Sequence, residues 1–170
     1  GAVGMGLASQ FSGRFSDKYG FRPFTFAGIS TMIVTNVIFS FFVADTSLWV
    51  VSPVLFLNGL GMGMWMAPNM SATLSTVGRG DYGSMSAFLN LIRNVGGVIG
   101  QALAAAIIAG IMLSRGVEVQ LNELTESTDP AVSEAFLAGW TLTFLVLTGF
   151  LVLALFAAFK TKVYTADSTD

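Results

Sequence analysis

Long stretches without a charged side chain alternate with short charged segments along this chain of 170 residues. Residues 24–43 and 135–159 contain no charge, and residues 84–113 contain only Arg93. The uncharged stretch 46–78 exceeds one crossing, since a transmembrane helix needs roughly 20 apolar residues. We therefore expect a helix over 48–73 with an interfacial segment beside it. A further stretch, 1–13, is too short to span alone. The pattern predicts an all-α fold, a polytopic membrane helix bundle with helices at about 1–13, 24–43, 48–73, 84–113 and 135–159.

Two other fold classes fit this pattern poorly. Four long uncharged segments would need a much larger soluble core than 170 residues provide. The alternating segments of about ten residues that mark a membrane β-barrel are not visible in the sequence. The composition agrees, because 54% of the residues are hydrophobic and 11% are charged, where roughly 25% charged residues are typical of a soluble domain. We expect a lipid bilayer around this chain.

The basic residues predict how the chain is oriented in the membrane, because short loops rich in Lys and Arg stay cytoplasmic. Arg14, Lys18 and Arg22 lie between the first two segments, Arg79 lies between the third and fourth, and Lys160 and Lys162 follow the fifth. The opposite connections, 44–47 and 114–134, carry more acidic than basic residues. The tail 160–170 is therefore predicted to be cytoplasmic. An odd helix count with a clipped first helix implies a complete protein that extends upstream.

The residue types that are missing exclude several kinds of chemistry. The chain contains no Cys and no His, which removes disulfides, thiolate nucleophiles, imidazole acid-base catalysis and the usual zinc ligands. It has no basic run and a net charge of -2, so it lacks the electrostatic footprint of nucleic-acid binding. We expect no enzyme activity, no cofactor, no metal site and no nucleic-acid partner.

A glycine-bounded charged segment, 13–23, is the first candidate for a functional element. Gly13 and Gly20 permit a tight reversal between helices, and Pro23 suits the first turn of the next helix. Asp17 can accept hydrogen bonds from a helix N-terminus, and Lys18 and Arg22 can pair with carboxylates or lipid phosphates. The spacing alone leaves two interpretations open, a gating loop built from Gly13, Asp17, Lys18, Gly20 and Arg22, or an ordinary basic loop that sets topology.

One face of the segment 84–113 is polar or small. At helical spacing this face includes Ser86, Asn90, Arg93, Gly97, Gln101 and Ala104. An Arg inside a membrane costs about 2.5 kcal/mol or more, so Arg93 should face protein or a water-filled cavity. It either contacts substrate or gates transport, or it binds helix carbonyls or snorkels to the interface. The neighbouring glycines indicate close helix contact.

The segment 48–73 carries two different stripes. Gly59, Gly63, Ala67 and Ser71 recur at intervals of four and predict a ridge for helix packing. Beside that ridge lie Asn58, Met62, Trp65 and Asn69, whose amides, thioether and aromatic ring suit an amphipathic organic ligand. Pro68 should kink this helix because it lacks the amide hydrogen that closes a helical turn.

Two of these segments resemble signatures of the major facilitator superfamily. Gly13, Asp17, Lys18, Gly20 and Arg22 match the loop Gly-x-x-x-Asp-Lys-x-Gly-x-Arg that joins helices in that superfamily. Arg93, Gly96, Gly97 and Gly100 resemble a stretch in the penultimate helix of its fourteen-helix drug:proton antiporters of the EmrB and QacA type. The long acidic connection before the last helix also fits that branch. By this resemblance the five segments correspond to the last five helices of the transporter.

The resemblance implies a transporter that exports small amphipathic compounds or drugs by alternating access, with proton entry as the energy source. Its partners would be a small-molecule substrate, protons, the lipid bilayer of the cell membrane and the missing N-terminal half. No Asp or Glu lies inside a predicted span, so the proton-carrying carboxylate would belong to that half. The expected cavity-lining residues are Asn58, Met62, Trp65, Asn69, Asn90, Arg93 and Gln101. Two alternatives stay open, a membrane-embedded scaffold protein and a metabolite transporter of the same superfamily.

Overall fold

The computed structural model of this chain describes residues 1–117 and 130–160, without the side chain of Asp17. The described part contains the helices α1 (Ala2–Tyr19), α2 (Arg22–Ser40), α3 (Leu48–Leu74), α4 (Tyr82–Ser114) and α5 (Pro130–Lys160), with a short 3₁₀ turn, η1 (Arg79–Asp81), before α4. No strand occurs in these residues. Four helical stretches, Arg22–Ser40, Leu48–Leu74, Arg79–Ser114 and Pro130–Lys160, are long and apolar enough to cross a membrane. The all-α membrane helix bundle is confirmed.

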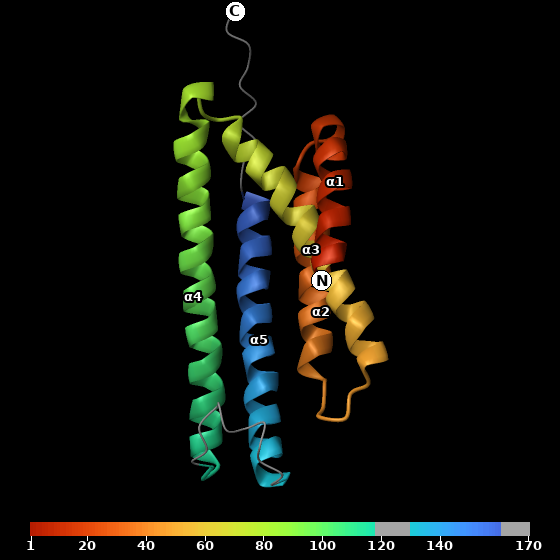
Figure 1. Cartoon of the computed structure of the whole chain (residues 1–170), viewed down its shortest axis with the longest axis vertical. Coiled ribbons are helices and arrows are strands. Elements are labelled where there is room, and N and C mark those ends of the chain that lie inside the picture. Colours follow the sequence, from red (N-terminus) through yellow and green to blue (C-terminus); the bar gives the residue numbers. More distant parts are fainter. Residues whose placement is uncertain (118–129, 161–170) are drawn as a thin grey trace, which may run out of the picture.

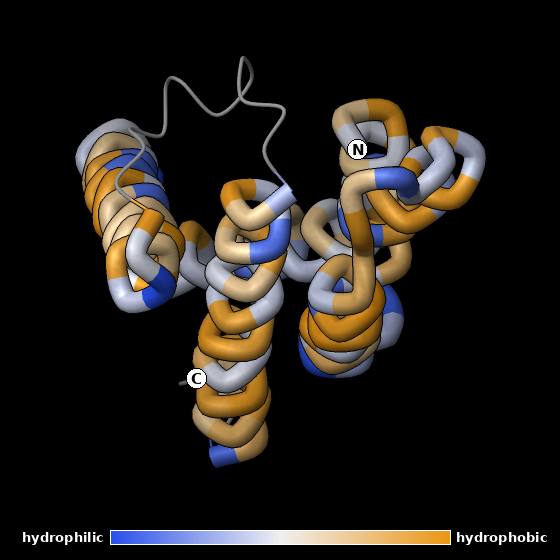
Figure 2. Tube along the Cα trace, turned by 90° about the horizontal axis from the view of Figure 1, so that it is seen from below, coloured by the Kyte–Doolittle hydropathy of each residue, from blue (hydrophilic) through white to orange (hydrophobic). Residues whose placement is uncertain are grey.

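The helices do not pack in the order of the chain. α3 packs against both α1 and α2, α2 also packs against α5, and α5 packs against α4. Figure 1 shows α5 between α4 on one side and the group α1 to α3 on the other. α3 approaches α4 only near their connection. Figure 2 shows hydrophobic residues along all of these helices, as expected for segments that meet hydrocarbon.

The first helix differs from the predicted one. It continues past Gly13 to Tyr19, so most of the segment predicted to be a loop is helical. The helix ends where Gly20 adopts a φ of 81° and its amide donates to the carbonyl of Ser16 at 2.8 Å. Charged residues mark the edge of the hydrocarbon region, but a helix can continue through them. It ends where a residue, commonly Gly, adopts a non-helical conformation. The prediction was therefore wrong about the length of this loop.

Glycines allow the closest helix crossings in the bundle. A Cβ added to Gly63 of α3 would lie 2.5 Å from the carbonyl oxygen of Met5 in α1. A Cβ added to Gly28 of α2 would lie 2.6 Å from the carbonyl oxygen of Gly61 in α3. On α5, Gly139 meets the backbone of Ile108 in α4 at 2.8 Å by the same measure. Membrane helices gain van der Waals contact in this way without a hydrophobic driving force between them.

Side chains of α5 satisfy the carbonyls at the C-terminal end of α2. The indole Nε1 of Trp140 donates to the carbonyl of Phe39 at 2.9 Å, and the hydroxyl of Thr141 donates to that of Ser40 at 3.0 Å. The last carbonyls of a helix lack the amide partner of a complete helical turn, and unsatisfied carbonyls in hydrocarbon are costly. The Phe39 carbonyl also accepts from the amide of Phe42 at 3.2 Å. The ring of Phe144 packs against those of Trp140 and Phe39, with centroids 4.7 and 5.3 Å apart. These contacts join α5 to α2.

Candidate functional site

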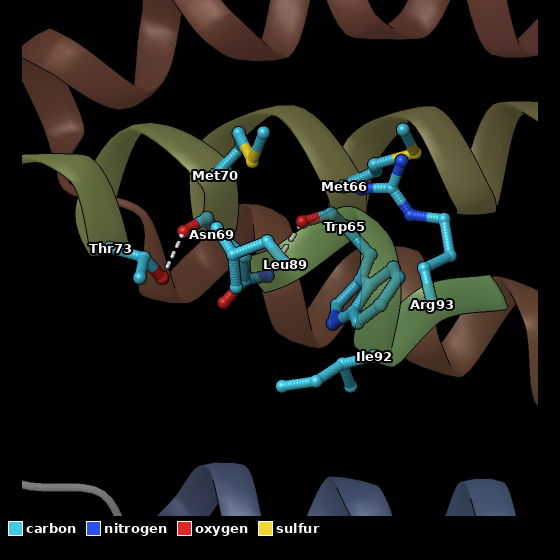
Figure 3. Close-up of a pocket in the computed structure, with 8 residues that line it drawn as sticks. All are labelled: Trp65, Met66, Asn69, Met70, Thr73, Leu89, Ile92 and Arg93. Carbon is cyan, nitrogen blue, oxygen red and sulfur yellow. Dashed lines mark hydrogen bonds between the residues drawn. The ribbon is translucent and has the colours of Figure 1, made fainter. Parts of the chain in front are cut away.

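A pocket of about 300 Å³ lies between the C-terminal half of α3 and the N-terminal half of α4. Its described lining consists of Trp65, Met66, Asn69, Met70, Thr73, Leu89, Ile92 and Arg93. The first five lie on α3 at a spacing that places them on one helix face, and the other three do the same on α4. Figure 3 shows these side chains around the ribbons of α3 and α4. The pocket brings together three predicted residues, Trp65, Asn69 and Arg93.

Arg93 is the charged group of this site. It is exposed within the structure, and its Nη1 donates to the Oδ1 of Asn90, one helical turn before it, at 3.1 Å. Among the described residues that line the pocket, no other side chain is charged at neutral pH. Asn90 is neutral, so this hydrogen bond holds the guanidinium in place without offsetting its charge. The site therefore combines a positive charge with an otherwise mostly apolar lining.

Asn69 links the pocket to α2. Its Nδ2 donates to the carbonyl of Trp65 at 2.6 Å and to the hydroxyl of Thr25 at 3.1 Å. The Thr25 hydroxyl in turn donates to the carbonyl of Phe21 at 3.0 Å. Because a carbonyl only accepts, the atom of Asn69 that faces Trp65 must be the nitrogen. Both amide hydrogens are then used, and hydrogen bonds run from the pocket to the turn that joins α1 and α2.

Asn58 and Met62 are not part of this pocket. The Nδ2 of Asn58 donates instead to the hydroxyl of Thr35 on α2 at 2.8 Å. Thr35 is only 1% exposed, and its hydroxyl is also within hydrogen-bond distance of the carbonyls of Thr31 and Met32. A half-buried amide with a partner on a neighbouring helix acts in helix association, and nothing further is needed to explain it. For Asn58 the structure favours packing over ligand contact.

The predicted residues Asn90 and Gln101 lie on an open stretch of α4. Residues 90–99 are all exposed, as is Gln101, and neither Asn90 nor Gln101 lines the pocket. Gly96, Gly97 and Gly100 meet no other atom within 4 Å of an added Cβ in the part of the chain that the structure describes. The close helix contact expected at these glycines is therefore not found within residues 1–117 and 130–160.

The predicted gating residues end up in two kinds of surroundings. Gly13 and Lys18 lie in the C-terminal part of α1, and the exposed Lys18 ammonium sits 5.6 Å from the centroid of the Tyr19 ring. Arg22 begins α2 and lines a small cavity of about 70 Å³ together with Asn69. The side chain of Asp17 lies outside the described part. Asn69 lines both this cavity and the pocket, so Arg22, one of the predicted gating residues, lies next to the pocket.

Several residues of the site were missed by sequence reasoning. Met66 and Met70 follow the predicted Trp65 and Asn69 by one residue, and both belong to the same pocket. Thr25 and Thr35 carry hydroxyls in a largely apolar helix, ten residues apart, and each accepts from an Asn of α3. That spacing was a usable signal, because Asn58 and Asn69 are eleven residues apart on the facing helix. Within the described residues, no group of His, Cys, Asp or Glu could hold a metal ion.

Comparison with known proteins gives a consistent result. The sequence profile of the Major Facilitator Superfamily matches residues 1–169. The riboflavin transporter RibZ of Clostridioides difficile (strain 630) is 31% identical over 105 residues, which cover 62% of this chain and 23% of that protein. The uncharacterized MFS-type transporter YcnB of Bacillus subtilis (strain 168) is 33% identical over 159 residues, which cover 89% of this chain and 31% of that protein.

A second Bacillus subtilis (strain 168) protein, the uncharacterized MFS-type transporter YhcA, is 26% identical over 136 residues, covering 80% of this chain and 25% of that protein. No solved structure matches. The chain therefore spans less than a third of the length of the curated relatives it matches. The comparisons confirm the resemblance at the level of the superfamily, and the fourteen-helix branch stays a prediction.

Proposed function

The chain belongs to the Major Facilitator Superfamily, and on that premise we propose that it forms one wall of a secondary active transporter for small amphipathic organic compounds. The observation that carries this proposal is the pocket between α3 and α4, where an aromatic ring, two thioethers, an amide and a guanidinium converge. Ligand sites are commonly apolar hollows with a few placed polar groups. The name of the relative RibZ, a riboflavin transporter, agrees with an organic substrate.

The open stretch of α4 would border the path of the substrate. A polar row in hydrocarbon is costly, and Asn90, Arg93 and Gln101 are exposed on one side of a candidate membrane span. A water-filled path between this wall and the rest of the protein would hydrate these groups. Alternating access would then open that path to one side of the membrane at a time. In this proposal a part of the protein outside this chain would supply the opposite wall.

Proton-coupled export is the energy source that we propose for the complete protein. It rests on the resemblance of Arg93, Gly96, Gly97 and Gly100 to the fourteen-helix antiporters. The predicted spans of this chain hold no Asp or Glu, so the carboxylate that binds the proton would belong to the part of the protein outside this chain. The C-terminal tail would lie in the cytoplasm, because basic residues cluster at that end of the helices.

The turn between α1 and α2 would act in gating. Hydrogen bonds from Asn69 to Thr25 and from Thr25 to Phe21 support this role. They connect the pocket to the turn, so a movement at the pocket would displace the turn as well. Asp17→Asn should slow transport more than it weakens substrate binding, because a latch affects conformational exchange and not the pocket itself. The matched control is Asp81→Asn in η1. Unaltered turnover in Asp17→Asn would remove the gating role.

The transport proposal is tested in proteoliposomes that hold the complete transporter. Riboflavin, ethidium and 2-naphthalenesulfonate serve as probes, and a pH gradient is applied across the membrane. We expect movement of at least one probe that grows with the amount of protein, depends on the gradient and collapses with a protonophore. Movement without a gradient would overturn proton coupling. A protein that moves none of these probes would favour the other candidate, a membrane scaffold.

The absence of Cys in this chain allows a direct test of the path. Single cysteines at Asn90 and Gln101 are compared with single cysteines at Val95 and Ile99, which lie on the opposite side of α4 and are also exposed in the structure. A thiol reacts as the thiolate, which forms in water and not in hydrocarbon. A membrane-impermeant maleimide should therefore label the first pair faster. Equal labelling of both pairs would contradict a water-filled path along α4.

A further inference from the structure

We infer that the pocket between α3 and α4 selects flat organic anions over cations. This inference rests on the proposed function, because it names the substrate class of the same pocket. Figure 3 shows the arrangement from which it follows, with the Arg93 side chain extending from α4 towards Met66 of α3. Two independent features of the pocket support it, the charge and the shape of the walls.

Within the residues that the structure describes, the charge of the pocket is positive and no carboxylate bonds to it. Helix α3 carries no ionisable side chain, and Arg93 is the single charged residue between Tyr82 and Ser114 of α4. Asp81 precedes Arg93 by twelve residues, roughly 18 Å along a helix. In the described part of the chain Arg93 bonds to the neutral Asn90 and to no carboxylate. A cation in this pocket would face a like charge beside a mostly apolar lining, which screens the repulsion less than bulk water does.

An anion has the opposite effect. A guanidinium carries five hydrogen-bond donors, and the bond to Asn90 uses one of its nitrogens. Its planar fork matches carboxylate, sulfonate or phosphate oxygens. Asn90 lies one turn away on the same helix and orients the fork without competing as an anion. A bound anion would therefore satisfy both the charge and the remaining donors of Arg93.

The walls favour a flat apolar body. Trp65 is 37% exposed, and its ring lines the pocket together with the side chains of Met66 and Met70. Leu89 and Ile92 close the side towards α4. Aromatic rings stack on such surfaces, and thioethers adapt to their shape. The volume of about 300 Å³ fits a small molecule of two or three fused rings.

The test compares two probes that share one ring system and differ in charge, 2-naphthalenesulfonate and trimethyl(2-naphthyl)ammonium. Binding of each radiolabelled probe to the complete transporter is measured in lipid nanodiscs, and empty nanodiscs correct for partition into lipid. We expect the sulfonate to bind at least about tenfold more tightly, the size of one charge-assisted hydrogen bond. Tighter or equal binding of the ammonium probe would overturn the inference.

The variants test whether Arg93 causes the preference. Arg93→Gln should lower affinity for the sulfonate about tenfold and leave the ammonium probe unchanged or bound more tightly. Arg93→Lys keeps the charge and should keep the sign of the preference, which covers the case in which Arg93→Gln does not fold. The matched control is Arg115→Gln, which removes the same charge from the exposed end of α4, outside the pocket. An unchanged preference in folded Arg93→Gln, or a preference that Arg93→Lys abolishes, contradicts the inference.

The binding assay and the transport assay separate the two proposals. Transport of the cation ethidium with no binding of the sulfonate would overturn the inference and keep the proposed function. Binding of the sulfonate that depends on Arg93, in a protein that transports no probe, would overturn the proposed function and keep the assignment of ligand class to the pocket. Transport of the sulfonate that falls in Arg93→Gln and not in Arg115→Gln supports both.

Discussion

Helices α3 and α4 carry similar sequence signals but have different surroundings. Each is a candidate membrane span with glycines and amides among apolar residues. In α3 the glycines Gly59, Gly61 and Gly63 are buried, and their positions leave no room for a Cβ beside α1 or α2. In α4 the glycines Gly96 and Gly97 are exposed and meet nothing within the described residues. The same residue types thus pack a helix in one place and lie open in the other.

The amides follow the same division. Asn58 and Asn69 of α3 donate to threonines of α2, whereas Asn90 of α4 bonds to Arg93 of its own helix. α3 lies between α1 and α2 and can satisfy its polar groups on both sides, while α4 has α5 as its main neighbour. Small and polar residues in a span therefore indicate a face that avoids lipid. They do not indicate whether protein, substrate or water covers that face.

The sharpest test of this difference compares a glycine of α3 with one of α4. Gly63→Val should lower the free energy of unfolding of the complete transporter by about 3 kcal/mol, because the new side chain meets the backbone of α1. Gly97→Val makes the same change in a helix interior and should cost less than ~0.5 kcal/mol if water covers that face. Thermal unfolding in detergent measures both.

The outcome for Gly97→Val can break the comparison. A loss as large as that of Gly63→Val would mean that another part of the protein packs tightly on α4, as helix contact at a glycine requires. The proposed water-filled path along that face would then be wrong. An unchanged stability of Gly63→Val would contradict the packing of α1 on α3.

The next largest effect is expected on transport. Arg93→Ala should lower transport about tenfold or more, because it removes the charged donor of the pocket. Asn58→Ala should leave substrate affinity within about twofold, since Asn58 bonds to Thr35 away from the pocket. Initial rates in proteoliposomes and the amount of protein in the membrane are measured together. If Arg93→Ala reaches the membrane and transports normally, the functional assignment of Arg93 fails.

The smallest effect is expected at the hydrogen bond that joins α2 and α3. A double-mutant cycle with Asn58→Leu and Thr35→Val should give a coupling energy of about 0.6 kcal/mol, the usual size of a side-chain bond between membrane helices. Thermal unfolding of the four proteins measures it. The same cycle at Asn90 and Arg93 reports a bond within α4 and therefore does not measure the association of helices. A coupling energy near zero between Asn58 and Thr35 would contradict the packing role of Asn58 and favour the predicted role in ligand contact.

The sequence alone determined where the spans lie and which residue types had to avoid lipid. The predicted helix 48–73 and the observed α3, Leu48–Leu74, nearly coincide, because hydrocarbon excludes charge and a helix is the simplest way to satisfy the backbone there. Trp65, Asn69 and Arg93 were also identified from their chemistry, and the structure places all three around one pocket. These results follow from the solvent, which acts on each segment separately.

The tertiary structure decided which partner each polar or small residue meets. It pairs Asn58 with Thr35, leaves Gln101 open, and adds Met66 and Met70 to the pocket. It also extends α1 to Tyr19, and the positive φ of Gly20 ends the helix there. Periodicity defines the face of a helix but not the neighbour of that face, because the neighbour depends on contacts between segments far apart in the chain.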